Sequence, residues 1–212
     1  MQKKLFSLFL SLAIAFSILP FNPVTAKAFP ALPTVYVNGT NGNDTSYGET
    51  AKTAVKTMAR AYSMVDDGGT IVICGNTDAV TETLPAKSVT ITSKTDTEDF
   101  TTSSAWLFSD SYGIYESFSA DVTLENMNIY TPSSIYHGFV ANGNSFNVGD
   151  GVAVQADQSY YSIDVIGGCR EFYGSGAQDD VGVNITINSG SNWNVYGAGC
   201  FEGDNSEKLK NT

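Results

Sequence analysis

Positive charge is scarce in this chain of 212 residues, which has 11 lysines and arginines against 22 aspartates and glutamates. A general nucleic-acid-binding protein needs a basic surface to neutralise phosphates, so the composition disfavours that class. Histidine occurs once, and the three cysteines include no Cys-x-x-Cys pair, so the common zinc-site patterns are absent. Hydrophobic residues still make up 42% of the chain, which is too much apolar material for wholesale disorder.

The first 28 residues have the organisation of a secretory signal peptide. Lys3 and Lys4 form a basic start, an apolar run covers residues 5–19, and Ala26 and Ala28 are small residues at the cleavage-site positions. The alternative is a membrane anchor, but a span needs about 20 apolar residues and this run is shorter. We therefore expect a protein secreted to a Gram-positive cell surface, with no membrane span in the mature chain.

Loss of this leader would remove three lysines and leave 8 basic against 22 acidic residues, a formal charge of −14. Between Thr95 and Glu207, Arg170 is the one lysine or arginine, against sixteen acidic residues. Such a surface repels polyanions, including polyuronates, unless a cation intervenes. A simpler role of the acidity is solubility outside the cell.

The segment that follows the leader predicts a strand, a loop and a helix. Residues 35–37 favour a strand, and 38–44 are rich in residues that tolerate positive φ. Over residues 53–65 the apolar positions recur every three or four residues, which predicts an amphipathic helix. It is expected to end at a turn over 66–69, followed by a buried strand over 70–73.

Beyond this point similar residues recur at intervals of about 30. Valine-led triplets begin at residues 89, 122, 152 and 183. Segments 163–167 and 193–197 match at an offset of 30, with Ile129 preceding Ile163 by 34, and phenylalanines recur at positions 108, 139, 172 and 201. These pieces are too short for helices, so we predict a solenoid with three short parallel strands in each coil. The alternative is an antiparallel β-sandwich, which gives no reason for a fixed period.

The entry segment also resembles a known family. Gly42-Asn43-Asp44, Gly48, the helix with Thr57 and Ala61, and Asp67-Gly68-Gly69-Thr70 are similar to the entry of secreted β-helix proteins of the pectin-lyase-like superfamily. The resemblance implies an all-β, right-handed parallel β-helix of about four to five coils with an N-terminal capping helix. Residues 184–190 and 195–199 are similar to repeats of large bacterial surface proteins on this fold. Lyases, hydrolases and adhesins all use this scaffold, so the resemblance leaves function open.

Two kinds of catalysis can be tested against the residues. A polysaccharide lyase needs cations or arginines around the uronate and a base for its proton. Arg170 is the one candidate, although an ion pair with Asp164 or Glu171 is its simpler role. A hydrolase needs two carboxylates, and Asp179 and Asp180 form the tightest pair, but no lysine accompanies them and a solvated turn is simpler. We predict no catalytic residue and keep Arg170, Asp179 and Asp180 as the alternatives.

No cofactor is predicted. Asn41, Asn43 and Asp44 offer oxygen atoms in one loop and are the candidates for calcium, but their spacing does not match an EF-hand and a structural turn is simpler. His137 has no cysteine partner at zinc-site spacing.

The three cysteines leave at least one thiol unpaired. Cys169 and Cys200 are one coil length apart and could stack on adjacent coils. The alternative is that these two and Cys74 are all buried thiols.

Tyrosines are the better candidates for binding, because their rings can stack on sugars while their hydroxyl groups form hydrogen bonds. Trp193 and the recurring phenylalanines are expected in the core. The candidate sugar-binding residues are Tyr112, Tyr115, Tyr136, Tyr160, Tyr161 and Tyr173.

The predicted organisation is a leader (1–28), an entry segment with the capping helix (29–69), β-helix coils (70–201) and a polar tail (202–212). The tail has no amphipathic cap, so it is also a candidate truncation point. The expected function is a non-catalytic scaffold that binds extracellular glycans or the surface of a host or neighbouring cell. The alternatives are a pectate-lyase-like or polygalacturonase-like enzyme, and a spacer whose coils continue in a longer polypeptide.

Overall fold

The computed structural model is mostly β-strand. The residues it describes are 31–79, 84, 86–108, 115–132, 137–156, 162–168 and 184–197. Every pairing between their named strands is parallel. The alternative of an antiparallel β-sandwich is therefore wrong for this part of the chain.

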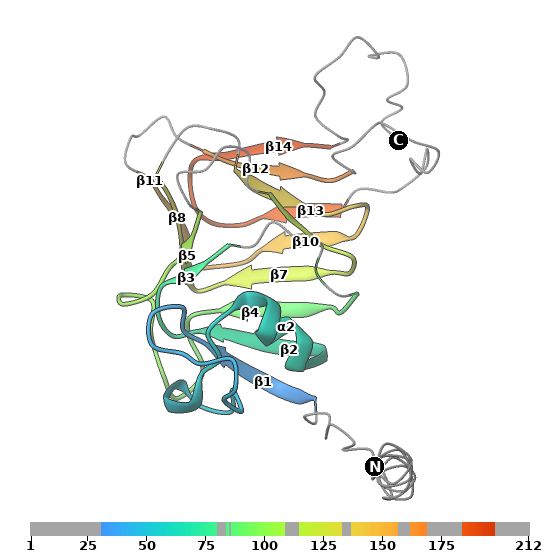
Figure 1. The fold of residues 1–212 in the computed structure, drawn as a ribbon. Helices are drawn as coiled ribbons and strands as arrows, with labels where there is room; N and C mark the ends of the chain where they lie inside the picture. The colour runs from blue at the N-terminus through green and yellow to red at the C-terminus, as the bar shows by residue number, and fades with distance from the viewer. Residues whose placement is uncertain are drawn as a thin grey trace, which may run out of the picture.

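The strands fall into three sheets, which we call A, B and C (Figure 1). Sheet A contains β1 (Leu32–Val37), β2 (Val65–Ile73), β4 (Val89–Thr92), β7 (Val122–Glu125), β10 (Ser145–Val148) and β13 (Asn184–Ile187), in that spatial order. Sheet B contains β3 (Thr77–Asp78), β5 (Trp106–Leu107), β8 (Met127–Thr131) and β11 (Val152–Ala156). Sheet C contains β6 (Tyr115–Ser117), β9 (Gly138–Val140), β12 (Ile163–Ile166) and β14 (Trp193–Tyr196).

The chain visits the sheets in a repeated order. From β4 to β12 it passes three times through sheet A, then sheet B, then sheet C, and β13 and β14 extend sheets A and C. Neighbouring parallel strands require such returns, because the chain must come back to the same end before it pairs again. Figure 1 shows the strands of sheet A stacked from β1 to β13 along the long dimension of the molecule. This order is compatible with the predicted parallel β solenoid.

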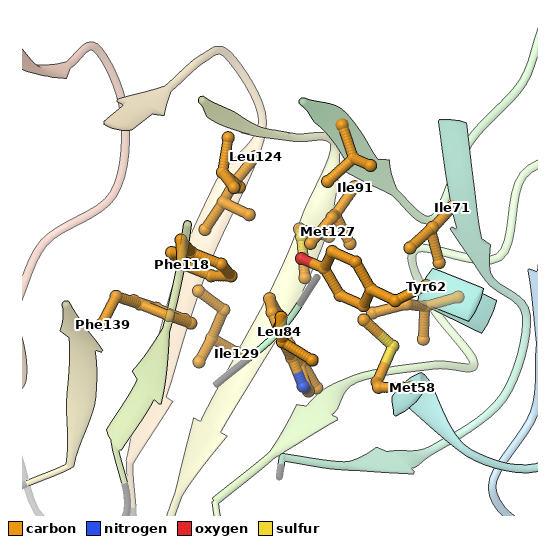
Figure 2. Close-up of a cluster of buried hydrophobic side chains, with 14 of the residues drawn as sticks. Met58, Tyr62, Ile71, Leu84, Ile91, Phe118, Leu124, Met127, Ile129 and Phe139 are labelled. Carbon is orange, nitrogen blue, oxygen red and sulfur yellow. The ribbon is translucent and has the colours of Figure 1, made fainter. Parts of the chain in front are cut away.

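Alternation along each strand separates a core face from an outer face. Ile91 and Leu124 lie in register on the core face of sheet A and are fully buried. Phe118, Phe139 and Phe146 stack on one another in the same core, with ring centroids 5.2 to 5.9 Å apart. Figure 2 shows side chains from different sheets meeting in this one cluster.

Helix α2 (Met58–Met64) covers the core at the N-terminal end of the molecule. Met58 and Tyr62 are 0% and 1% exposed and lie near Ile71 of β2 (Figure 2). The expected amphipathic helix is thus present, with its apolar side against the core.

The helix is shorter than the predicted range of 53–65. The chain forms a 3-10 turn, η1 (Ala51–Thr53), and is then non-helical until Met58, which follows Thr57, the N-cap of α2. Val55 forms a bridge to β1, and Asp44 Oδ1 accepts hydrogen bonds from the backbone N–H groups of residues 56 and 57 at 2.8 and 2.9 Å. These tertiary contacts override the local helical pattern.

The predicted turn over 66–69 is also different. These residues belong to β2, and the register between β1 and β2 shifts here from Leu32 opposite Val65 to Thr34 opposite Thr70. Gly68 has φ of 78° in this irregularity, a conformation that glycine adopts at little cost. The turn-forming residues therefore bend a strand without ending it.

The structure divides the predicted valine series between two sheets. Val89 and Val122 pair in sheet A, but the triplet at Val152 is β11 of sheet B. The sheet A position of that repeat is Phe146, which pairs with Val122 only 24 residues earlier (146 − 122). Ile129 likewise belongs to sheet B and not to sheet C. A fixed period misassigns these strands because the connections between strands differ in length.

Two other predictions from the repeats are confirmed. Ile163 pairs with Trp193 between β12 and β14, at the expected offset of 30 (193 − 163). Phe108 and Phe139 are both buried, with ring centroids 5.5 Å apart. The other two members of the phenylalanine series, at positions 172 and 201, lie outside the described residues.

Candidate functional site

Most of the residues singled out from the sequence lie outside the described part of the chain. These are Arg170, Asp179, Asp180, Tyr112, Tyr136, Tyr160, Tyr161, Tyr173, Cys169 and Cys200. In chain order, Tyr112 falls between β5 and β6, Tyr136 between β8 and β9, and the pair 160–161 between β11 and β12. In the sequence, each of these positions therefore follows a strand of sheet B and precedes a strand of sheet C.

Tyr115 is not an exposed stacking surface. Its side chain is 6% exposed, and its hydroxyl group donates a hydrogen bond to Asp164 Oδ2 at 2.8 Å. Gly138 lies between the two residues in register, and a Cβ there would collide with the Asp164 carbonyl oxygen. Asn194 donates to Asp164 Oδ1 at 3.1 Å. The expectation that Tyr115 presents its ring to sugars is therefore wrong, because the residue joins sheet C strands on their outer face.

Two of the three calcium candidates, Asp44 and Asn43, accept hydrogen bonds through their side chains. Asp44 Oδ1 holds two backbone N–H groups, and Oδ2 accepts from the Thr57 hydroxyl group at 3.1 Å. Asn43 Oδ1 accepts from the backbone and side chain of Thr45. Asn41 donates its backbone N–H to Asn38. The described residues contain no group of three or more histidine, cysteine or acidic side chains placed to hold a metal, and calcium binding by this loop stays a prediction.

Cys74 is a free, buried thiol in the structure. Its Sγ donates to the Val37 carbonyl oxygen at 3.3 Å, and burial raises its pKa to about 11. A thiol with a raised pKa has little thiolate at neutral pH, so Cys74 behaves as a small core residue.

Two ionisable side chains point into the core. Glu116 is fully buried in register with Phe139 and Val165, and His137 is 1% exposed with its ring stacked 5.5 Å from Phe108. Their burial separates both groups from any polymeric substrate outside the protein. Glu116 also acts on Tyr62, whose pKa is raised well above its ordinary value, first by burial and second by this carboxylate.

The outer face of sheet A carries the most regular array of polar side chains. Strand register places one residue from each strand in a single line, which we call the outer row: Thr34, Thr70, Thr90, Thr123, Asn147 and Thr186. The first five are partly exposed and the last is exposed. Neighbouring parallel strands are about 4.8 Å apart, so the row repeats a hydroxyl or amide group at that interval.

The polar groups of the outer row are available to a ligand. Within the described residues, no hydrogen bond joins any of these six side chains to another protein group. Thr92, only two positions beyond Thr90 on the same strand, is different: it is 2% exposed and donates to the Lys94 carbonyl oxygen at 3.1 Å. The free hydroxyl groups are thus a property of the row and not of threonine in general.

The outer face of sheet A carries neutral and acidic side chains. The strands of sheet A contain no lysine or arginine, whereas Asp66, Asp67 and Glu125 belong to them. The tyrosine of these strands, Tyr36, is 9% exposed and donates to Glu98 Oε2 at 2.8 Å. Burial and this carboxylate raise the pKa of Tyr36. Sheet A therefore offers hydroxyl and amide groups, and neither an aromatic platform nor a basic patch.

The sequence predicted several strands of this face but did not identify the outer row as a candidate site. Thr90 and Thr123 are the second residues of two valine-led triplets, so alternation places them opposite the core. Their neighbours in the row come from strands whose register the repeats did not give correctly. The pattern could have identified a polar outer position, but the unoccupied hydroxyl groups are visible only in three dimensions.

Within the described residues, no helix is both long and apolar enough to cross a membrane, since α2 has seven residues. Comparisons of the chain with protein-family models, with curated proteins and with solved structures found no match.

Proposed function

We propose that this chain is a secreted, cell-surface protein that binds neutral extracellular glycans without catalysis. Its three sheets would form one right-handed parallel β-helix of the pectin-lyase-like kind, and the outer row of sheet A would be the binding face. The observation that carries the proposal is the line of six hydroxyl and amide side chains that have no hydrogen-bond partner among the described residues.

Three features support the solenoid. All pairings between named strands are parallel, the chain passes through sheets A, B and C in the same order three times, and residues from the sheets share one core. The leader with its basic start and apolar run supports export. A surface-displayed protein of this kind would meet the glycans of a host or of neighbouring cells.

The chemistry of the outer row suits a sugar polymer. A threonine hydroxyl group both donates and accepts hydrogen bonds, as sugar hydroxyl groups do, and an asparagine amide does the same with two atoms. A parallel sheet holds these groups at a constant interval, so a linear chain lying across the strands can meet several of them at once. Many weak contacts made together then provide useful affinity.

The charge of this face selects the class of glycan. Sheet A has acidic residues and no basic ones, in a chain with a formal charge of −11. A polyuronate would be repelled by this field, whereas a neutral polysaccharide would not. Glycans built from uncharged sugars are therefore the expected ligands.

The tyrosines in the sequence segments that connect strands of sheets B and C remain candidates for additional sugar contacts. Tyr112, Tyr136, Tyr160 and Tyr161 all occur where the chain passes from one of these sheets to the other. Tyr173 follows β12 in the sequence. This position makes them a second set to substitute once binding has been measured.

The alternative is a carbohydrate-active enzyme that uses Arg170, Asp179 or Asp180. A pectate-lyase-like reaction would release unsaturated products in the presence of calcium, and a hydrolase would release reducing ends. Product formation from pectin or from a neutral polysaccharide, lost on substitution of these residues, would favour the enzyme over the binding protein.

The binding face can be tested with calorimetry on linear neutral oligosaccharides and on an oligogalacturonate. The double variant Thr90→Val and Thr123→Val removes two hydroxyl groups while keeping the shape and strand preference of the side chains. Two hydrogen bonds correspond to roughly 1–3 kcal/mol, so affinity for the neutral ligand should fall about 5- to 150-fold. Thr102→Val, at an exposed turn position away from the row, is the matched control.

Unchanged affinity in the double variant would remove the outer row from the binding site. A preference for the oligogalacturonate would contradict the argument from charge.

A further inference from the structure

In the part of the chain that the structure describes, strand β13 ends sheet A with an unpaired edge. It pairs with β10 on one side, and sheet A contains no strand beyond it among the described residues. A free strand edge presents a row of backbone N–H and C=O groups that can accept a further strand. Figure 1 shows β13 and β14 at the C-terminal end of the stacked strands.

The opposite edge of sheet A is covered by the chain itself. On β1, the Tyr36 N–H group donates to the Gly48 carbonyl oxygen at 2.7 Å. The Tyr36 carbonyl oxygen accepts from the Val55 N–H group at 2.9 Å. Pro33 removes one further donor from the same strand. The two edges are therefore unequal, and β13 is the open one within the described ranges.

The apolar side chains at the β13 end are incompletely buried. Phe146 and Val148 of β10 are 0% exposed, whereas their register partners Ile185 and Ile187 in β13 are only partly buried against the core. Val195 of β14 is 50% exposed, although its register partner Val165 is fully buried. One further layer of apolar side chains would complete the burial.

The described segment that forms β13 and β14 carries no charged side chain. Residues 184–197 contain no aspartate, glutamate, lysine or arginine. Natural proteins commonly protect an open strand edge with charged side chains or proline, and neither protects β13. In a chain with a formal charge of −11, two copies repel each other over most orientations, and an uncharged surface lets them meet without opposed like charges.

We propose that β13 is the contact through which two copies of this chain associate, with β13 of one copy pairing antiparallel to β13 of the other about a two-fold axis. An isologous contact uses the same patch twice, so an edge without charge and with apolar residues on one face is self-complementary. The partner copy supplies the apolar layer that Ile185, Ile187 and Val195 lack.

Strand geometry fixes which registers are allowed. Residues directly opposite each other must point to the same face, so the two residue numbers in each pair must add up to an even number. Centring the pair on Thr186 satisfies this condition, because Ile185 then faces Ile187 of the second copy on the core side. Thr186 faces Thr186 on the outer side.

The first test is the oligomeric state of the full chain by sedimentation velocity over a wide range of protein concentration. A concentration-dependent dimer is expected. Thr186→Lys would place two ammonium groups opposite each other on the two-fold axis and should raise the dimer dissociation constant at least about tenfold. Asn147→Lys, in the same outer row but one strand further inside, is the matched control and should leave dimerisation intact.

Cross-linking tests the register. Directly opposed residues of antiparallel strands have Cα atoms about 4.5–5.5 Å apart, within the range of a disulfide. Thr186→Cys should therefore give an oxidised dimer on non-reducing gels, and Asn147→Cys, in the same background of native cysteines, should not.

Circular dichroism of each variant establishes that it is folded. A folded chain that is monomeric at every concentration would overturn the proposal, because other parts of this chain would then cover the edge. A dimer that Thr186→Lys and Asn147→Lys affect equally would also overturn it, since the contact would lie elsewhere.

Discussion

Two buried tyrosine hydroxyl groups give opposite predictions for the same chemical change. The Tyr115 hydroxyl donates to the Asp164 carboxylate at 2.8 Å in a buried site, and it links β6 to β12 across the intervening strand β9. The Tyr62 hydroxyl is buried in the core and has no hydrogen-bond partner among the described residues. Substitution by phenylalanine removes one oxygen atom in each case and leaves the ring in place.

The expected magnitudes follow from what each hydroxyl group does. A hydrogen bond to a charged group contributes about 1.5–3 kcal/mol, and Asp164 would keep its buried carboxylate with one donor fewer, so Tyr115→Phe should destabilise the protein by that amount. At Tyr62 the folded state holds a desolvated hydroxyl group without a hydrogen bond, which costs roughly 1–3 kcal/mol. Tyr62→Phe should therefore be neutral or stabilising.

Urea unfolding at neutral pH, followed by circular dichroism, measures both effects as shifts of the transition midpoint at constant m-value. The two variants should move the midpoint in opposite directions, or Tyr115→Phe alone should lower it. Equal destabilisation by both variants would refute the reasoning, because it would mean that loss of the oxygen atom matters regardless of its hydrogen bond.

Three further predictions concern the core. Phe139 packs against the rings of Trp106, Phe118 and Phe146. Phe139→Ala should therefore lower the free energy of unfolding by about 3–5 kcal/mol, and Phe139→Leu should lower it much less in the same urea experiment. Equal losses would show that the core is loosely packed around this ring. Burial raises the pKa of Cys74 from 9.0 to about 11, so the folded state favours the neutral thiol. The contribution of this preference to the free energy of unfolding should be complete below pH 9 and lost as the pH rises towards 11. Iodoacetamide should modify Cys74 slowly in the native protein at pH 8 and rapidly in urea, as measured by mass spectrometry, and equal rates would contradict its burial.

The sequence predicted the parallel arrangement because recurring apolar residues reflect stacked strands. The pair Ile163 and Trp193 shows this directly. The sheet to which a strand belongs could not be predicted in the same way. Val122 and Val152 have similar neighbours, yet one is in sheet A and the other in sheet B, since a strand's alternation is the same in every sheet.

Contacts distant in sequence account for the other differences. The predicted helix lost its first turns because Asp44, twelve residues before Lys56, accepts the backbone N–H of Lys56 in a non-helical segment. Tyr115 was expected outside, but Asp164, 49 residues later, takes its hydroxyl group into a buried hydrogen bond. The outer row needed both correct register and knowledge of which hydroxyl groups lack partners, and single-residue patterns contain neither.

The covered edge of β1 decides how far assembly can proceed. A sheet with two open edges can add copies at both ends without limit and grow into a fibre. Here the loop containing Gly48 and Val55 already satisfies the outer edge of β1, so pairing at β13 consumes the one edge of sheet A that is open within the described residues. Self-association through this strand therefore terminates at two copies. Two copies can in this way pair their sheets without forming amyloid-like polymers.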